Sequence, residues 1–354
     1  MSLWGVRSRS GLNVDELENL IASEQSLFEP LSSASFLITG ATGWFGVWLL
    51  DSLCAADDAH GLGLRITAVS RDPSRFLGRF PAFAGDRRIS WINSDVRKLE
   101  LRSGNFTHII HGAADSAQPR DAQDTADLFG TIIQGTERVL EAAGSECRGL
   151  LLISSGAVYG PSTTGQAAFA ESEAGGPNPA MAKNAYAEGK RAAEMMAAIR
   201  ALRGAPISIA RCFAFVGPHM PFDRHFAIGN FIADAVAGRE IRVRSDGRPL
   251  RSYLYMTDLV RALLVILNRG SMGAAYNVGS DVPVSIEQLA HMVNRVVGGK
   301  GVNVEGSPTH RSEHYVPDTT RLRLELNFEQ TVDLETAIYR TAAWYRAQTD
   351  SSLP

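Results

Sequence analysis

Short apolar runs alternate along the first two thirds of the chain with longer runs in which apolar residues recur every three or four positions. The short runs have the length of buried strands, and they lie at 36–38, 64–70, 89–92, 107–111, 150–153 and 207–213. Helical spacing marks the stretches between them, at 47–53, 125–143 and 184–203. Strands that alternate with helices in this way predict a doubly wound parallel sheet, so the expected fold class is α/β.

The turn after the first strand is rich in glycine and reads Gly40-Ala41-Thr42-Gly43-Trp44-Phe45-Gly46. The N-terminus of a helix attracts anions, and glycine lets a pyrophosphate approach the backbone closely. The turn therefore predicts a dinucleotide cofactor in a Rossmann-type domain. The residues expected to hold the cofactor here are Gly40, Thr42, Gly43, Trp44, Phe45 and Gly46. An ordinary glycine turn is the alternative, and the flanking strand and helix patterns weigh against it.

The end of the second strand, at Ser70-Arg71-Asp72, bears on which dinucleotide is bound. An acidic side chain at this point binds the ribose 2′-hydroxyl of NAD, whereas an arginine accommodates the 2′-phosphate of NADP. Because Arg71 stands where the acid is expected, the sequence favours NADP over NAD. The alternative is that Arg71 stacks on adenine or faces solvent.

Composition and charge exclude several classes of protein. A formal charge of −3 and a pI near 6.3 give no reason to expect nucleic acid or an anionic membrane as a partner. No apolar run has the length of a membrane span, and the first ten residues, which look flexible, lack the core of a signal peptide. We therefore expect a cytoplasmic protein. Cys54, Cys147 and Cys212 lie far apart in apolar surroundings and indicate buried thiols, with neither a disulfide framework nor a metal site.

Tyr186 and Lys190 are four residues apart in a helical stretch, so their side chains share a face. A lysine ammonium, together with an oxidised nicotinamide, stabilises the phenolate of a tyrosine. Tyr186 can then remove the proton of a substrate hydroxyl while hydride leaves for the nicotinamide. A serine hydroxyl would orient the same oxygen, and the fifth strand ends in Ser154-Ser155.

Taken together, these features resemble the extended short-chain dehydrogenases/reductases, and more narrowly the nucleotide-sugar epimerase/dehydratase family. The resemblance runs from about residue 35 to about residue 344. Its matching segments are Ser155 to Gly160, Tyr186 to Glu194, Arg211 to Pro218, Arg251 to Leu259 and Tyr276 to Gly279.

The resemblance implies roles for individual residues. It makes Ser155, Tyr186 and Lys190 the catalytic set, with Ser154 the weaker candidate for the serine. It places Asp95 and Val96 at the adenine, and Ala113 and Ala114 beside the nicotinamide, while His111 reads as a packed histidine at a strand end. It also implies a homodimer formed through the helices at 125–143 and 184–203.

The same resemblance implies a nucleoside-diphosphate sugar as substrate. Arg251 matches the family arginine that contacts the diphosphate, although a salt bridge to Asp258 or Asp246 is the alternative. Ala214 stands where relatives have an asparagine for the diphosphate, which is a departure from the pattern. The loop from His219 to His225 is expected to face the sugar, with His219 as a substrate contact and no metal bound.

Two departures bear on the reaction. The 4,6-dehydratases of the family carry an Asp-Glu pair after the catalytic serine or threonine, where this chain has Gly156-Ala157. The 3,5-epimerising reductases use a cysteine at the position of Ala157. The remaining chemistry is hydride transfer at one carbinol, by a C4 epimerase or a 4-keto reductase. The alternatives are an NADPH-dependent reductase of a lipophilic carbonyl, like the dihydroflavonol reductases, and a non-catalytic dinucleotide-sensing protein.

The expected organisation has three parts. Residues 1–30 form an N-terminal extension with a helix that begins near Asn13 and ends before Pro30. Residues 31–215 form the dinucleotide-binding Rossmann domain. Residues 216–354 form mainly a smaller substrate-binding lobe, with helices at 226–236 and 332–346 and a late strand at 276–279.

Overall fold

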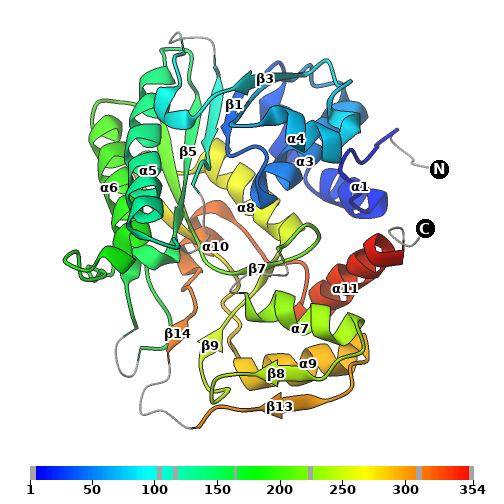
Figure 1. Ribbon diagram of the computed structural model, residues 1–354. Coiled ribbons are helices and arrows are strands. Elements are labelled where there is room, and N and C mark those ends of the chain that lie inside the picture. The colour runs from blue at the N-terminus through cyan, green and yellow to red at the C-terminus, as the bar shows by residue number, and fades with distance from the viewer. Residues whose placement is uncertain are drawn as a thin grey trace. The chain divides into compact units, whose positions relative to one another are not determined.

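The computed structural model describes residues 5–101, 106–114, 119–162, 166–221, 226–307 and 313–350 (Figure 1). The chain divides into two compact units. Unit 1 comprises residues 1–160, 175–212 and 260–276, and unit 2 comprises residues 161–174, 213–259 and 277–354. Neither unit is one continuous stretch, because the chain crosses between them at several points.

Unit 1 is built on a seven-stranded sheet with the strand order β11-β6-β5-β4-β1-β2-β3. The strands are β1 (Ser35–Thr39), β2 (Arg65–Ser70), β3 (Ile89–Asn93), β4 (His108–His111), β5 (Gly149–Ser155), β6 (Ile207–Cys212) and β11 (Ala275–Val278). Neighbours from β6 to β3 pair in parallel, which confirms the predicted doubly wound Rossmann-type sheet. The order reverses beside β1, so the carboxyl ends of β1 and β4 lie next to each other, where such sheets bind ligands.

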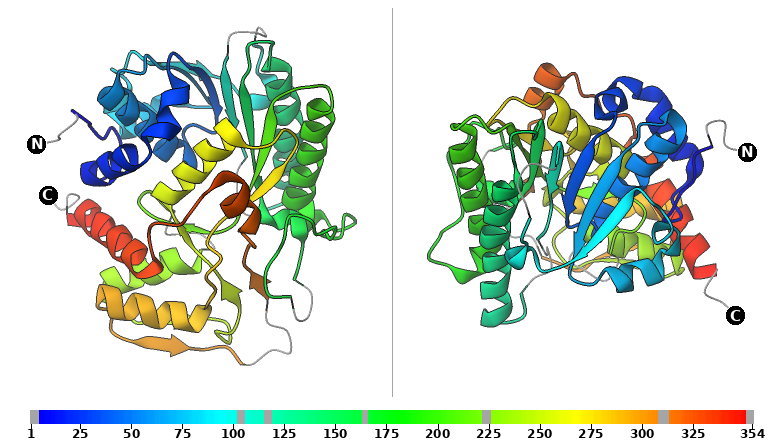
Figure 2. Two further views of the ribbon diagram at one scale, coloured as in Figure 1. Left: turned by 180° about the vertical axis from the view of Figure 1, so that it is seen from behind. Right: turned by 90° about the horizontal axis from the view of Figure 1, so that it is seen from above.

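Helices cover both faces of this sheet (Figure 2). On one face lie α5 (Ala122–Ala142) and α6 (Ala185–Ala201), whose apolar residues share one buried cluster with those of the strands. On the other lie α3 (Trp44–His60) and α8 (Met256–Arg269). A short helix, α4 (Pro73–Arg79), follows β2. Cys54, Cys147 and Cys212 are free and buried, as predicted from the sequence.

The N-terminal extension differs from its prediction in two ways. The helix begins after its Asn13 cap, as expected, but α1 (Val14–Ser23) stops at Glu24 and a second short helix, α2 (Gln25–Phe28), follows. Residues 8–10 are also held in place, because the buried carboxylate of Asp51 on α3 accepts four hydrogen bonds from them. The expectation of a flexible start is therefore wrong for these three residues.

Unit 2 combines short strands with four helices among its described residues. The strands are β7 (Phe215–Val216), β8 (Ile241–Val243), β9 (Leu250–Arg251), β10 (Leu254–Tyr255), β12 (Val284–Ser285), β13 (Val302–Val304) and β14 (His314–Tyr315). The helices are α7 (Ala227–Val236), α9 (Ile286–Val297), α10 (Thr320–Leu326) and α11 (Leu334–Asp350). Of the helices in the described ranges, none has both the length and the apolar character needed to cross a membrane.

Candidate functional site

The glycine turn brings two backbone segments so close that side chains would not fit. Gly40 has a φ of +74°, and a Cβ atom on it would lie 2.6 Å from the carbonyl carbon of Gly112 at the end of β4. A Cβ on Gly46 would lie 2.3 Å from the carbonyl oxygen of Ala41. No side chain caps the N-terminus of α3 at Gly43. This bare helix end fits the pyrophosphate of a dinucleotide, as the sequence predicts.

At the end of β2, the arginine and the carboxylate have different surroundings. Arg71 is exposed. Asp72 is a helix cap, since its carboxylate accepts from the backbone N–H of Arg75 at 3.0 Å. Nearby, Asp95 forms an ion pair with Arg97 at 2.7 Å, and the hydrogen bonds from Arg97, aided by the charges of Arg97 and Arg71, hold the pKa of Asp95 below its usual value. Asp72 and Asp95 thus already have partners within the protein, while the side chain of Arg71 is exposed to solvent.

The end of β4 is fixed by a buried histidine. Thr136 on α5 donates to the Ile132 carbonyl at 2.6 Å, so its oxygen accepts from Nε2 of His111 at 3.1 Å. Nδ1 of His111 is then an acceptor for Thr39 Oγ1 at 2.7 Å, and Thr39 in turn accepts from the N–H of Ala113 at 3.3 Å. This chain of hydrogen bonds joins β1, β4 and α5 and sets the backbone at Ala113. His111 is a packed strand-end histidine, as expected.

Ser155, Tyr186 and Lys190 meet at the carboxyl end of β5. The Ser155 side chain lies close enough to Tyr186 to lower the pKa of the phenol, and its Oγ accepts from the N–H of Ala157 at 3.2 Å. Lys190 donates from Nζ to the carbonyl oxygen of Ile153 at 2.7 Å, and this Nζ lies 5.9 Å from the centre of the Tyr186 ring. The three side chains that the sequence singled out are therefore neighbours.

Burial governs the proton affinities of this group. It raises the pKa of Tyr186, and the nearby Ser155 side chain acts in the opposite direction. It lowers the pKa of Lys190 to about 8, while the neighbouring Cys212 and then Glu194 act to raise it. A phenolate at Tyr186 therefore needs further positive charge, which an oxidised nicotinamide supplies when it is bound.

Sequence reasoning assigned no role to a buried ion pair beside this group. Arg211 on β6 contacts the carboxylate of Glu194 on α6, with Nη2 at 2.7 Å from Oε2. Glu194 follows Lys190 by four residues, so the spacing on the helix was a usable signal. The position of Arg211 opposite Ser154 on β5 follows only from the register of the sheet.

Of the predicted substrate residues, Ser155 lies in unit 1, and Arg251 and His219 lie in unit 2. Arg251 forms an ion pair with Glu313 at 3.5 Å and donates to the carbonyl oxygen of Leu250 at 2.9 Å. His219 has a φ of +66°, and its ring lies 4.6 Å from that of Trp344 on α11. Asp223, Arg224 and His225 of the same loop lie outside the described residues.

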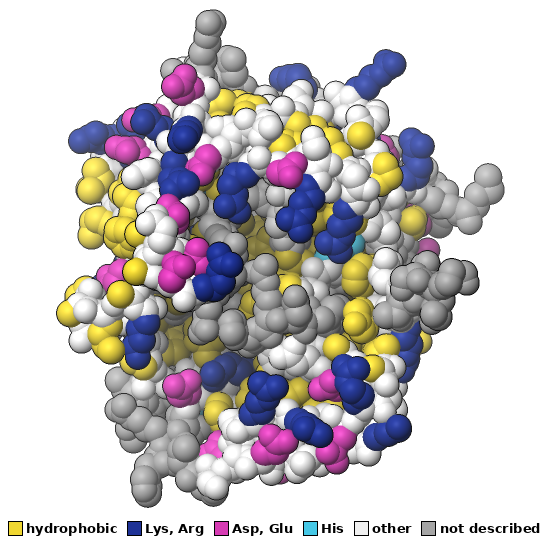
Figure 3. Space-filling model, in the orientation of Figure 1, with side chains coloured by type: hydrophobic (Ala, Val, Ile, Leu, Met, Phe, Trp, Pro, Cys, Tyr) yellow, Lys and Arg dark blue, Asp and Glu magenta, His cyan; other side chains and the backbone are white. Residues whose placement is uncertain are grey.

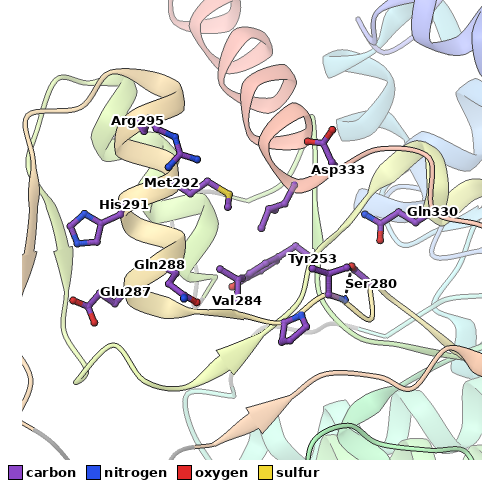
Figure 4. Close-up of a pocket in the computed structure, with 13 residues that line it drawn as sticks. Tyr253, Ser280, Val284, Glu287, Gln288, His291, Met292, Arg295, Gln330 and Asp333 are labelled. Atoms are coloured by element: carbon purple, nitrogen blue, oxygen red, sulfur yellow. Dashed lines mark hydrogen bonds between the residues drawn. The ribbon is translucent and has the colours of Figure 1, made fainter.

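Unit 2 also contains a cavity of about 680 Å³ that the sequence did not reveal (Figure 4). The ring of Tyr253, two residues after Arg251, lies against it together with Val284. Gln288 and Met292 of α9 line one side, and Asp333, at the start of α11, lies on another. None of the site residues predicted from the sequence lines this cavity.

A parallel sheet with a bare glycine turn at its switch point, and a Ser/Tyr/Lys group at the end of β5, define a dinucleotide-binding enzyme of the short-chain dehydrogenase/reductase type. A model of the NAD dependent epimerase/dehydratase family matches residues 36–279. The chain belongs to this family.

The relatives act on nucleotide sugars. The chain is 28% identical to "UDP-glucuronic acid decarboxylase 1" of Xenopus tropicalis over 346 residues, which cover 94% of this chain and 79% of the relative. It is 26% identical to "dTDP-glucose 4,6-dehydratase" of Streptomyces griseus over 318 residues, which cover 87% and 93%.

Two solved structures have the same fold. A UDP-glucose 4-epimerase of Thermotoga maritima with UDP-glucose has a TM-score of 0.74 at 20% identity, covering 89% of this chain and 99% of that one. A dTDP-glucose 4,6-dehydratase of Streptomyces venezuelae with NAD bound has a TM-score of 0.74 at 22% identity, covering 90% and 98%.

Proposed function

We propose that the chain transfers hydride at a single carbinol of a nucleoside-diphosphate sugar, as a C4 epimerase or a 4-keto reductase. The observation that carries this proposal is the Ser155–Tyr186–Lys190 group with Gly156-Ala157 directly after the serine. The group can remove one proton from one hydroxyl or return it. The two residues after Ser155, Gly156 and Ala157, provide neither the acid and base that an elimination of water requires nor the cysteine of the 3,5-epimerising reductases.

In this mechanism, Ser155 hydrogen-bonds the reacting oxygen and Tyr186 takes its proton as the carbinol becomes a ketone. Lys190, anchored to Ile153, provides positive charge beside the phenolate. The nicotinamide accepts or returns the hydride when the cofactor is bound. In the opposite direction, Tyr186 returns the proton to the oxygen of the ketone.

For the cofactor, we infer NADP in preference to NAD. Arg71 is exposed at the point where the adenine ribose is expected, and Asp72 is held as the cap of α4. A guanidinium can bind the 2′-phosphate through two hydrogen bonds. Solved neighbours hold NAD, so this chain would differ from them in its cofactor.

For the assembly, we propose a homodimer formed through α5 and α6. Large apolar side chains are exposed on both helices and at the end of α6, namely Phe129 on α5, Met195 and Ile199 on α6, and Leu202 directly after it. Apolar side chains also gather on the side of the molecule where these helices lie (Figure 3). Covering such a patch with a second copy removes apolar surface from water.

The reaction is tested by incubating the protein with UDP- and dTDP-sugars, including 4-keto sugars, and each cofactor, followed by chromatography and mass spectrometry of the nucleotide sugar. Epimerisation gives an isomer of unchanged mass that chromatography separates from the substrate, and reduction of a 4-keto sugar adds two hydrogens. A product that has lost water or carbon dioxide would overturn the proposal and assign the chain to the chemistry named for its relatives.

A further inference from the structure

The ion pair between Glu194 and Arg211 is buried and takes no part in the proton transfer proposed above. Only 11% of the Glu194 side chain and 16% of the Arg211 side chain are exposed. Nε of Arg211 also lies 3.1 Å and 3.2 Å from the two carboxylate oxygens, so the contact is bidentate. Charges are stable in such surroundings only when they are paired and hydrogen-bonded.

Further hydrogen bonds fix this pair to the elements that carry the Ser/Tyr/Lys group. Ser154 Oγ donates to Glu194 Oε1 at 2.5 Å. Nη1 of Arg211 donates to the Tyr159 hydroxyl at 2.9 Å, and the guanidinium lies 4.9 Å from the centre of that ring. A single carboxylate thus has a fixed position relative to β5, β6 and the turn after Ser155.

Glu194 is also the anion beside Lys190. The two residues are one turn apart on α6 and share a face. The other groups that face Lys190 are Tyr186 on the same helix, the Ile153 carbonyl on β5, Cys212 on β6 and His111 on β4. Burial raises the pKa of Cys212 to about 12 and lowers that of His111 to about 3, so both are uncharged at neutral pH.

We propose that Glu194 is a positioning residue whose carboxylate, fixed by Arg211 and Ser154, keeps Lys190 protonated beside Tyr186. This inference rests on the proposed function. Without the carboxylate, the buried ammonium of Lys190 would lose the negative charge of Glu194, which raises its pKa. Arg211 cannot lose its proton, whereas lysine readily does so when buried. Lys190 would therefore become neutral and cease to stabilise the phenolate.

The chain offers a direct measurement because it contains only four lysines, Lys98, Lys183, Lys190 and Lys300. Full-length protein labelled with 13C at the lysine Cε atoms gives a small set of NMR signals, and a Lys190→Met variant assigns the one from Lys190. Its titration midpoint is then followed with pH. In Glu194→Gln we expect this midpoint to fall by about one pH unit or more.

A second variant makes the test independent of damage to the fold. In Arg211→Met the cation is lost and Glu194 remains, so the Lys190 midpoint should rise. Ser154→Ala keeps both charges and should leave the midpoint close to that of the wild type. Glu188→Gln is the matched control, because this carboxylate lies on the same helix but pairs with Arg191 at 3.7 Å, and it should cause no shift.

Shifts of opposite sign in Glu194→Gln and Arg211→Met would show that the charge of Glu194 keeps Lys190 protonated. Loosened packing alone would move both midpoints in the same direction. An unchanged midpoint in Glu194→Gln, or a fall in Arg211→Met, would overturn the proposal. If Glu194→Gln does not fold, a rise in Arg211→Met that Ser154→Ala does not reproduce supports the proposal, because Ser154→Ala disturbs the same cluster without removing a charge. The measurement needs no substrate, so a failure of the proposed reaction is distinguishable from a failure of this inference.

Discussion

Lys190 lies one turn after Tyr186 on α6, and its Nζ atom is 5.9 Å from the centre of the tyrosine ring while it donates to the Ile153 carbonyl. Its charge is thus close to the phenol, and its position is set by the backbone of β5. Burial nevertheless raises the pKa of Tyr186. In the proposed mechanism, proton removal by Tyr186 therefore depends on the bound cofactor as well as on Lys190.

Tyr186→Phe should abolish turnover and leave cofactor binding intact. Proton transfer by a positioned side chain contributes about 10²–10⁴-fold to a rate, so a loss of at least this size is expected. The measurements are the rate of nicotinamide oxidation or reduction and the cofactor affinity by calorimetry. Tyr339→Phe, at a tyrosine that is 61% exposed, should behave as the wild type. A wild-type protein that binds cofactor but turns over none of the sugars or lipophilic carbonyls offered would favour the sensor.

Arg71→Ala should weaken NADPH binding about 10- to 100-fold, since hydrogen bonds to charged groups contribute about 1.5–3 kcal/mol. The affinity for NADH should change little. Arg65→Ala is a suitable control, because Arg65 is an exposed arginine at the opposite end of β2. Titration of each variant with both reduced cofactors gives the four affinities needed. Tighter binding of NADH than NADPH by the wild type would contradict the role proposed for Arg71.

The elements that the sequence predicted well carry their signal locally. Strand runs such as 64–70 and the Asn13 cap are visible within a few residues, and the structure has β2 at Arg65–Ser70 and α1 from Val14. The helix α8 was missed although its sequence is amphipathic, since Met256, Leu259 and Leu263 recur at helical spacing and are inaccessible to solvent. Its polar residues Thr257, Arg261 and Asn268 lie together on another side, so the helical pattern was visible in the sequence.

The helix α9 was missed as well, although its start is marked in the sequence. Its N-terminus has a complete capping box between Ser285 and Gln288, and this signature was present in the sequence. The signal was therefore readable and was not used. By contrast, the contact between Thr39 and His111 joins residues 72 positions apart and depends on β4 lying beside β1. Contacts of this kind follow from the strand order and not from spacing along the chain.

The same distinction applies to the site. Tyr186 and Lys190 could be paired from the sequence because one helix carries both. The contact between Arg211 and Glu194 could not, since it requires β6 to lie next to β5 and α6 to pack on both. The sequence therefore predicts site residues that lie at a regular spacing on one helix. It does not predict the residues from distant parts of the chain that contact them.

Gly46→Ala should destabilise the protein by about 2 kcal/mol or more, because the added methyl group overlaps the backbone of Ala41. The glycine turn must then open, so cofactor binding should also fall. Urea denaturation gives the free energy of unfolding, and cofactor titration gives the affinity. Gly85→Ala is the control, since a Cβ there meets nothing within 4 Å. Equal free energies of unfolding for the two variants would contradict this prediction, because they would show that the backbone around Gly46 accommodates a methyl group without loss of stability.

The buried His111 should make the protein sensitive to acid below pH 6.5. Burial lowers its pKa in the folded state from 6.5 to about 3, so between these values only the unfolded chain takes up the proton. The free energy of unfolding should therefore decrease as the pH falls, by about 2 kcal/mol at pH 5 from this residue. His108, whose pKa burial lowers to about 4, adds to the loss in the same range.

In His111→Gln, stability at pH 7 should be lower, because the hydrogen bonds to Thr39 and Thr136 are disturbed. Its dependence on pH between 6.5 and 5 should, however, be shallower than in the wild type, since one titrating group is gone. The control is His291→Gln, at an exposed histidine of α9, which should keep the wild-type slope. Urea denaturation at several pH values measures all three slopes. A slope in His111→Gln equal to that of the wild type would mean that another group causes the acid sensitivity, and that His111 does not hold its neutral form in the folded protein.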